Sequence, residues 1–239
     1  MHRFTSPNEI SPSQHFAAKV VGFFYLFTNV TAIIAFSIRG KIMLLRDAAQ
    51  TGANILASER AFRIGIALEL ITVAGVLALL WGLSVALRPV DRNLVWLGAF
   101  LRLAENILLA FITLLEFAML ALLKDRFMGA FTPEQAQALA HSFLRVYADS
   151  FNVGFFFLGL GSAVFSYVWW QSRYIPRALA GLGFVGSLLM AVMSVVIIIF
   201  PGAARLGISY MLPMGLYEFG LGFWLLIKGI RQPETPVIA

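Results

Sequence analysis

Three charged residues, Arg102, Glu105 and Glu116, interrupt an otherwise apolar stretch near the middle of the chain. At about 100° of rotation per residue, a helix would place all three on one face together with Leu109 and Ile112. A charged side chain at the centre of a membrane helix costs about 2.5 to 3.5 kcal/mol on insertion scales, so it turns toward a partner or toward water inside the protein. Carboxyl groups held in this way can bind a cation or carry out acid–base chemistry. The stretch therefore predicts a buried polar site.

Two further carboxyl groups, Glu69 and Glu218, lie inside other apolar stretches. Neither of them, nor Glu116, has a cation within one turn of its own helix, so no local ion pair explains their presence. These three glutamates are therefore the best candidates for a functional role. Tyr217 lies beside Glu218, and for this tyrosine we favour packing over ligand contact.

Two acid–base pairs have a simpler explanation as well as a functional one. Arg102 and Glu105 are spaced i, i+3, and Arg145 and Asp149 are spaced i, i+4 with Asn152 on the same face. Side chains at these spacings can neutralise one another on a single helix. Two explanations of these pairs are therefore compatible with the sequence: structural ion pairs, and a site for a ligand or proton.

The composition is that of an integral membrane protein. Of 239 residues 60% are hydrophobic and only 13% are charged, with a mean hydropathy of +0.84; a soluble domain has about 45–50% apolar and about 25% charged residues. The net charge of +6 comes from Lys and Arg placed singly in short loops, which favours anionic lipid headgroups over nucleic acid as the partner. The chain has no cysteine, which excludes disulfides and thiolate chemistry.

Several familiar motifs are absent or misleading. The three histidines, at positions 2, 15 and 141, lie outside the apolar runs, so we expect no histidine-ligated haem or zinc, no other metal and no cofactor. The glycines of residues 181–186 spell GxGxxG, but they lie inside an apolar run and favour close helix packing over nucleotide binding. The chain also has no phosphate-binding Walker loop, paired-aspartate diphosphate motif or GxSxG elbow.

The apolar runs predict an all-α, polytopic transmembrane helix bundle. Six spans are expected, at residues 16–38, 62–87, 94–123, 143–170, 178–200 and 206–228. Short surface helices are expected in loop one, opening at Asp47, and in loop three, opening at Pro133. Pro213 is expected to kink the sixth span. The domain organisation is then a mobile polar N-terminus (1–15), one bundle domain (16–228) and a polar C-terminal tail (229–239).

The charged residues of the spans predict one polar vestibule. It would open toward the two surface helices, narrow at Arg102, Glu105 and Glu218, and require the second, third, fourth and sixth spans to be mutual neighbours. The vestibule residues expected to bind a ligand are Arg63, Glu69, Arg102, Glu105, Glu116, Arg145, Asp149, Asn152, Tyr217 and Glu218.

An even number of spans places both termini on the same side of the membrane. The cations are almost equally divided between the two sides, but the shortest loops, on the side of the termini, carry two cations each. The tendency of such loops to stay inside favours cytoplasmic termini. Six spans are also half the number of a typical carrier, which is compatible with a homodimer.

Three blocks of sequence resemble the bacterial domain-of-unknown-function 4386 family. They are the run from Asp47 to Glu59 with Phe62 and Arg63, the block Arg102 to Glu105, and the block Ser172 to Arg177. The blocks occur in the order found in the family, and the likeness extends from about residue 17 to residue 228. The resemblance implies a multi-pass protein of the bacterial cytoplasmic membrane, without an established activity or catalytic residues. It directs attention to a loop helix over the vestibule with Asp47, Thr51 and Asn54, and to Arg63, Arg102 and Glu105.

Three functions are compatible with the sequence. The first is binding or transport of a cation, a proton or a small polar or amphipathic molecule through the buried carboxyl groups. The second is an intramembrane enzyme that modifies a lipid or isoprenoid with a glutamate as acid or base. The third is a structural or regulatory membrane subunit whose charges only hold the bundle together.

Overall fold

The computed structural model describes residues 10–45, 47–124, 129–207 and 209–231. Helices contain 88% of these residues, and none of them lies in a strand. The expected all-α bundle is thus confirmed. The elements in chain order are α1 (Pro12–Ile42), α2 (Ala48–Ala57), α3 (Glu59–Leu87), α4 (Arg92–Leu123), α5 (Pro133–Ser172), α6 (Arg177–Ile199), the short 3-10 helices η1 (Pro201–Leu206) and η2 (Ser209–Met211), and α7 (Leu212–Ile227).

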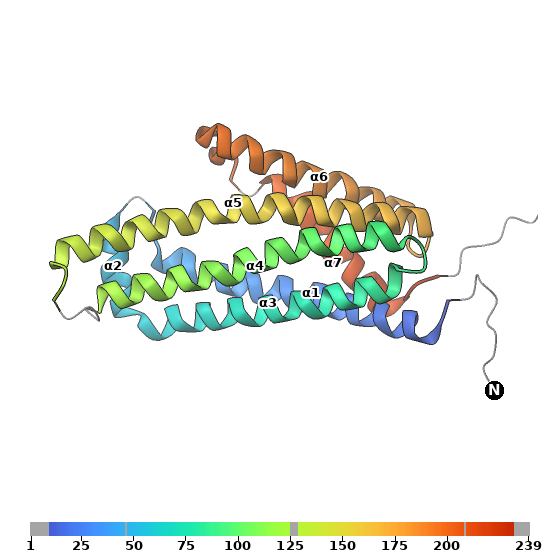
Figure 1. The fold of residues 1–239 in the computed structure, drawn as a ribbon, viewed down its shortest axis with the longest axis horizontal. Coiled ribbons are helices and arrows are strands. Elements are labelled where there is room, and N and C mark those ends of the chain that lie inside the picture. Colours follow the sequence, from blue (N-terminus) through green and yellow to red (C-terminus); the bar gives the residue numbers. More distant parts are fainter. Residues whose placement is uncertain (1–9, 46, 125–128, 208, 232–239) are drawn as a thin grey trace, which may run out of the picture.

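Six segments are long and apolar enough to cross a membrane, namely α1, α3, α4, α5, α6 and the segment Ser209–Ile227 that includes α7. The described parts of the two ends of the chain lie at one end of the bundle, which we call the termini side (Figure 1). Helix α2 lies at the opposite end, which we call the α2 side (Figure 1).

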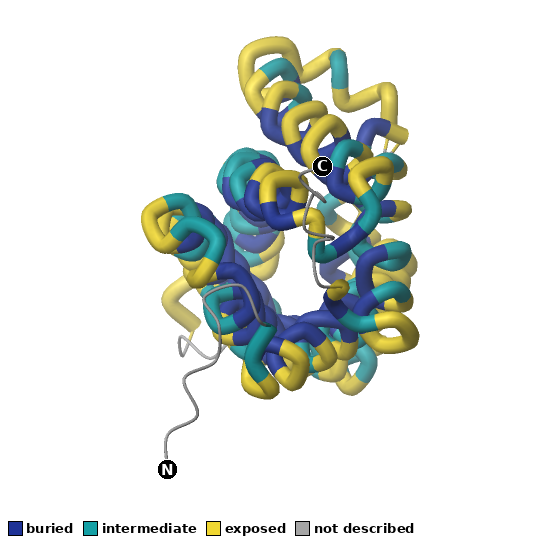
Figure 2. Tube along the Cα trace, turned by 90° about the vertical axis from the view of Figure 1, so that its right-hand side faces the viewer, coloured by how far each residue is buried: buried dark blue, intermediate teal, exposed yellow. Residues whose placement is uncertain are grey.

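The six spanning helices form a closed ring. Each packs against the next spanning helix in the chain, and α7 packs against α1. The view along the bundle shows the helices arranged around a central axis (Figure 2). Helices that do not pack directly can therefore still bring long side chains together near this axis.

Polar caps begin the helices where the sequence breaks the apolar runs. Ser11 and Gln14 form a capping box at the start of α1, and Thr132 and Gln135 form another before Pro133 at the start of α5. Asp91 accepts hydrogen bonds from the first backbone amides of α4. These caps satisfy amide donors that have no partner within the helix.

The structure differs from the sequence-based expectations in four details. Residues 12–15, predicted to be mobile, belong to α1, and Ile230 of the predicted tail is buried in the core. The surface helix expected before the fourth span is continuous with it, so α5 has 40 residues. Pro213 lies at the start of α7 and does not kink it. The packing partners of α7 are α1 and α6, so the sixth span is not a direct neighbour of the second, third and fourth among the helix pairs described.

Candidate functional site

The first buried ionic cluster, the Arg39 cluster, connects three helices at the α2 side. Arg39 near the end of α1 donates from Nε and Nη2 to the two carboxylate oxygens of Glu116 on α4, over 2.6 and 2.9 Å. Its Nη1 donates to Glu69 of α3 over 2.8 Å, and Nη2 also donates to the carbonyl of Gly65 over 3.2 Å. The Glu116 pairing is bidentate, which is the strongest and most directional form of this contact. All three charged residues are buried.

A fourth helix and the loop helix cover this cluster. The guanidinium carbon of Arg39 lies 5.9 Å from the centre of the Tyr147 ring on α5, a distance compatible with a cation–π contact. Ile55 of α2 is buried in the apolar core of the α2 side, the core that also contains Tyr147. The Arg39 cluster is therefore closed in by α5 and lies beneath α2.

The second buried ionic cluster, the Arg102 cluster, lies nearer the termini side. Arg102 and Glu105 of α4 approach within 3.5 Å (Nη1 to Oε2), and both are buried. Arg102 also interacts electrostatically with Glu218 of α7 and with Tyr25 and Tyr217. Charged groups of α4 and α7 thus face one another across the ring, although these two helices do not pack directly.

The α1 side of the Arg102 cluster is polar as well. Asn29 donates to Glu218 Oε2 over 3.0 Å and to the carbonyl of Tyr25 over 2.8 Å. The rings of Tyr25 and Tyr217 lie edge to face with their centres 6.4 Å apart. Glu218 is only partly buried, whereas Tyr217 is fully buried.

The two clusters differ in how well their polar atoms are satisfied. In the Arg102 cluster and next to it, buried polar atoms without a hydrogen bond are Arg102 Nη1, Glu105 Oε2 and Asn106 Oδ1, the first two of which form the ion pair at 3.5 Å. The hydroxyl groups of Ser166 and Tyr217 lie beside one another near this cluster. No atom of Arg39, Glu69 or Glu116 is among the unpartnered atoms of the described residues. Most buried polar groups in proteins have a partner, so an unpaired group calls for a bound water, an ion or a function. The buried polar atoms of the Arg39 cluster are therefore fully hydrogen-bonded, whereas those of the Arg102 cluster are not.

The layer between the clusters mixes polar and apolar contacts. Arg39 lies 14 residues beyond Tyr25, and Glu116 lies 14 residues beyond Arg102; this corresponds to about 21 Å along the helix axes. Between them the hydroxyl groups of Thr31 and Thr72 lie 2.7 Å apart, joining α1 to α3. Leu109 and Ile112 of α4 are buried in the same interval.

Gly154 of α5 marks open space in the interior. It is buried, yet a Cβ atom added there would meet no atom within 4 Å. On α5 it lies between Tyr147, beside Arg39, and Gly161, whose added Cβ would lie 2.7 Å from Arg102 Cγ. There is thus room for an added methyl group on α5 between the levels of the two clusters.

The loop helix residues highlighted by the family resemblance build the connection between α1 and α3. Asp47 caps α2 by accepting from the Gln50 amide over 2.8 Å. Thr51 exchanges hydrogen bonds with the backbone of Leu44, over 2.8 and 3.0 Å, and Asn54 donates to the carbonyl of Ile42 at the end of α1. These polar side chains hold α2 against the end of α1 and contact neither cluster directly.

Several predicted vestibule residues lie outside both clusters. Arg63 donates to Glu59 over 2.8 Å, and Glu59 also pairs with Lys124 over 2.7 Å, at the edge of the α2 side. On α5, Arg145 and Asp149 are exposed and Asn152 is half-buried.

The length of α5 explains this exposure. Counting back about 20 residues, the span of a 30 Å hydrocarbon layer, from the exposed Trp170 reaches residue 150. Arg145 and Asp149 therefore lie at or beyond the membrane boundary, where water solvates them. The spacing correctly placed both on one face of the helix, but that face is the outer one.

Sequence reasoning missed the contribution of α1. Arg39 was assigned to the first loop because the apolar run ends at residue 38, whereas α1 continues to Ile42. A signal was present: Thr28, Thr31, Ala35 and Arg39 recur at helical spacing and are all buried. Asn29 carries no such signal, because nothing in the local sequence connects it with Glu218.

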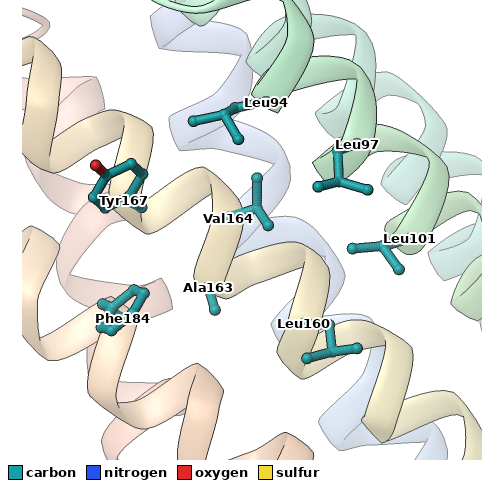
Figure 3. A pocket seen from close by; sticks show the side chains of 8 residues that line it. All are labelled: Leu94, Leu97, Leu101, Leu160, Ala163, Val164, Tyr167 and Phe184. Carbon is teal, nitrogen blue, oxygen red and sulfur yellow. The ribbon is translucent and has the colours of Figure 1, made fainter.

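An apolar groove lies on the outer surface between α4, α5 and α6 (Figure 3). Its volume is about 370 Å³, and we call it the α4–α6 groove. The residues that line it are Leu94, Leu97 and Leu101 of α4, Leu160, Ala163, Val164 and Tyr167 of α5, and Phe184 of α6. Close contact of Gly161 with Arg102, and of Gly98 with the Phe165 ring, separates this groove from the ring centre.

The glycines of the GxGxxG run serve helix packing, as the sequence analysis favoured. A Cβ on Gly183 would lie 2.5 Å from the Tyr217 ring, and one on Gly186 would lie 2.8 Å from the backbone nitrogen of Met214. The small residues of α6 thus admit the ring of Tyr217, which reaches the Arg102 cluster.

The fold and the buried charges define a multi-pass α-helical membrane protein with two ionic clusters inside a ring of six spanning helices. The chain belongs to the family described as a domain of unknown function, DUF4386, which matches residues 20–229. The resemblance stated from the three sequence blocks is thereby confirmed. Neither the curated proteins nor the solved structures contain a match to this chain.

Proposed function

We propose that this protein binds a proton or another small cation at the Arg102 cluster and moves it across the membrane. The observation that carries the proposal is incomplete hydrogen bonding in the interior: Arg102 Nη1 and Glu105 Oε2 form an ion pair at 3.5 Å without a hydrogen bond, and Asn106 Oδ1 beside them has no hydrogen-bond partner. Leaving a buried polar group unpaired costs about 1–3 kcal/mol. A ligand bound among these atoms would remove this cost.

The charge balance supports a cationic occupant. With both carboxyl groups ionised, Arg102 contributes +1 and Glu105 and Glu218 contribute −1 each, which gives −1. An uncompensated buried charge costs several kcal/mol. A bound proton or monovalent cation removes this cost, whereas a neutral polar or amphipathic molecule would not. The Arg39 cluster has the same formal charge, but none of its buried polar atoms lacks a hydrogen bond. The charge balance therefore favours a cation at the Arg102 cluster only in combination with the incomplete hydrogen bonding there.

Ion flux into liposomes tests the proposal. The protein is reconstituted into liposomes that contain the pH indicator pyranine, and a potassium diffusion potential drives cations inward; radioactive sodium uptake is measured in parallel. We expect faster proton or sodium entry than in protein-free liposomes. Glu105→Gln and Glu218→Gln should each slow it at least about tenfold, because loss of a buried charged partner costs more than the 1.4 kcal/mol that corresponds to tenfold.

Two further variants make the result specific. Glu59→Gln removes a carboxyl group from the edge of the α2 side and should leave the flux unchanged. Tyr217→Phe removes a buried hydroxyl group that lies beside Ser166 and Tyr25, and it should reduce flux; thermal unfolding measured in parallel separates this effect from a loss of stability. Wild-type flux equal to that of empty liposomes, or equal flux in all variants, would refute the proposal.

The cellular setting follows from the family resemblance and the loop charges. We place the protein in the bacterial cytoplasmic membrane with both termini in the cytoplasm. The α3–α4 and α5–α6 loops of the termini side each carry two arginines, at positions 88 and 92 and at positions 173 and 177. Short loops with this charge are retained on the cytoplasmic side.

A further inference from the structure

The α4–α6 groove has the dimensions and chemistry of a site for a hydrocarbon chain. Seven of its eight lining residues are apolar, and Tyr167 supplies the one hydroxyl group (Figure 3). The groove volume is about 370 Å³. A methylene group takes up about as much space as one water molecule in the liquid, about 30 Å³, so the groove has room for roughly 12 methylene groups. All three helices are membrane spans, so the groove opens toward lipid.

The groove is confined to one leaflet. Its deepest residue on α4, Leu101, is nine residues from Arg92, and its deepest residue on α5, Leu160, is 13 residues from Arg173. At 1.5 Å per residue these separations are about 13 and 20 Å, close to half of a hydrocarbon layer of about 30 Å. The groove therefore runs from the headgroup level of the termini side to about the bilayer centre.

Positive charge lies at the headgroup end of the groove. Arg92, Arg173 and Arg177 occupy the ends of α4, α5 and α6 that border it, and all three are exposed. Within the described part of the chain none of them forms an ion pair; Arg177 lies 5.7 Å from the Trp170 ring. Asp91 is the acidic residue of this edge, and it caps α4. The net charge of these four residues is +2, which favours binding of an anion.

We propose that the α4–α6 groove binds one acyl chain of an anionic phospholipid from the bilayer, whose phosphate contacts Arg92, Arg173 and Arg177. Arginine is the side chain best suited to phosphate because its planar donors match phosphate oxygens. The lipid would fasten α6, the helix that tilts away from the others in Figure 1, to α4 and α5. This site is independent of the cation site, since the α4–α5 contact separates the two.

Native mass spectrometry tests the assignment. The protein is released from bilayers with equal amounts of phosphatidylglycerol and phosphatidylcholine, and the retained lipids are counted. We expect one phosphatidylglycerol per chain, with at least about tenfold preference over phosphatidylcholine, which corresponds to about 1.4 kcal/mol. Val164→Trp, which fills the groove, should remove this lipid, and the double variant Arg173→Gln, Arg177→Gln should remove the preference.

Matched controls identify the site. Val185→Trp places the same ring on an exposed position of α6 that does not line the groove, and Arg60→Gln with Arg205→Gln removes two exposed arginines from the α2 side. Both controls should retain the lipid. In the unaltered protein, phosphatidylglycerol brominated on its acyl chains should quench the exposed Trp96 and Trp170 more than brominated phosphatidylcholine does, a readout that needs no variant to fold.

Three outcomes would overturn the assignment. Equal retention of both lipids would exclude selection by the headgroup. Retention that survives Val164→Trp would exclude the groove as the site. Loss of the lipid in Val164→Trp with no effect of the arginine double variant would show that the groove holds an acyl chain but that Arg173 and Arg177 do not select the headgroup, which contradicts the proposed phosphate contacts.

Discussion

At the scale of residues, the two ionic clusters contain the same side-chain types but differ in how completely these are hydrogen-bonded. Arg39 directs four hydrogen bonds to two carboxylates and one carbonyl, so its charge is fully used. Arg102 is equally buried, but its Nη1 lies 3.5 Å from Glu105 and has no hydrogen-bond partner. The difference lies in geometry and not in composition, since each cluster combines one arginine with two glutamates.

Removing Arg39 should therefore be severely destabilising. Arg39→Gln leaves Glu69 and Glu116 buried without their cation, and loss of one partner of a buried ion pair costs about 3–5 kcal/mol. Thermal unfolding in detergent should show a large drop in midpoint. The triple variant with Glu69→Gln and Glu116→Gln should recover much of the loss, because no buried charge then remains. A triple variant less stable than Arg39→Gln alone would contradict the account.

At the scale of elements, the helices are held in the ring by close contacts at small residues. Gly159 of α5 faces α6, where an added Cβ would lie 2.6 Å from Ala191 N and from Ser187 O. These are backbone atoms, which cannot move aside without separating the helices. In membranes such small-residue contacts bring helices near enough for extensive van der Waals packing.

Two glycines of α5 provide a matched comparison of this effect. Gly159→Ala should lower the unfolding midpoint and loosen the α5–α6 contact, because the new methyl group overlaps backbone. Gly154→Ala adds the same group to the same helix where nothing lies within 4 Å, so it should be neutral or stabilise by up to about 1 kcal/mol through helix propensity. If both substitutions lower the unfolding midpoint equally, overlap with the backbone of α6 is not the cause of the destabilisation.

At the scale of the whole molecule, the ring of six spans fixes which loops share a side of the membrane. The chain contains no cysteine, so single cysteines can be placed without background. Ser13 and Asn93 are exposed on the termini side, and Ala49 and Glu134 are exposed on the α2 side. The two pairs must be accessible from opposite sides.

Labelling with a membrane-impermeant maleimide measures this topology. Ala49→Cys and Glu134→Cys should react in intact cells, whereas Ser13→Cys and Asn93→Cys should react only after the membrane is opened. If Ser13→Cys and Asn93→Cys react in intact cells and the other two variants do not, the proposed cytoplasmic location of the termini is contradicted. The arrangement of the six helices would be unaffected by that result. Labelling of one member of a pair without the other would contradict the six-span arrangement itself.

The sequence by itself determined the membrane class, the number of spans and most of their bounds, because hydrocarbon admits only long apolar helices whose backbone is internally bonded. It also identified Glu69, Arg102, Glu105 and Glu116 as buried charges, since lipid cannot solvate them; Glu218, predicted with them, is only partly buried. These conclusions depend on one helix at a time.

Only the tertiary structure decided which charges meet. The closed ring places α7 between α1 and α6, so Glu218 accepts a hydrogen bond from Asn29 and interacts electrostatically with Arg102. Glu69 and Glu116 meet Arg39 about 21 Å away along the bundle. Local spacing cannot reveal this, because the partners are up to 189 residues apart in sequence. The face that each helix turns inward depends on its neighbours, which is also why Arg145 and Asp149 shared a face but not the interior.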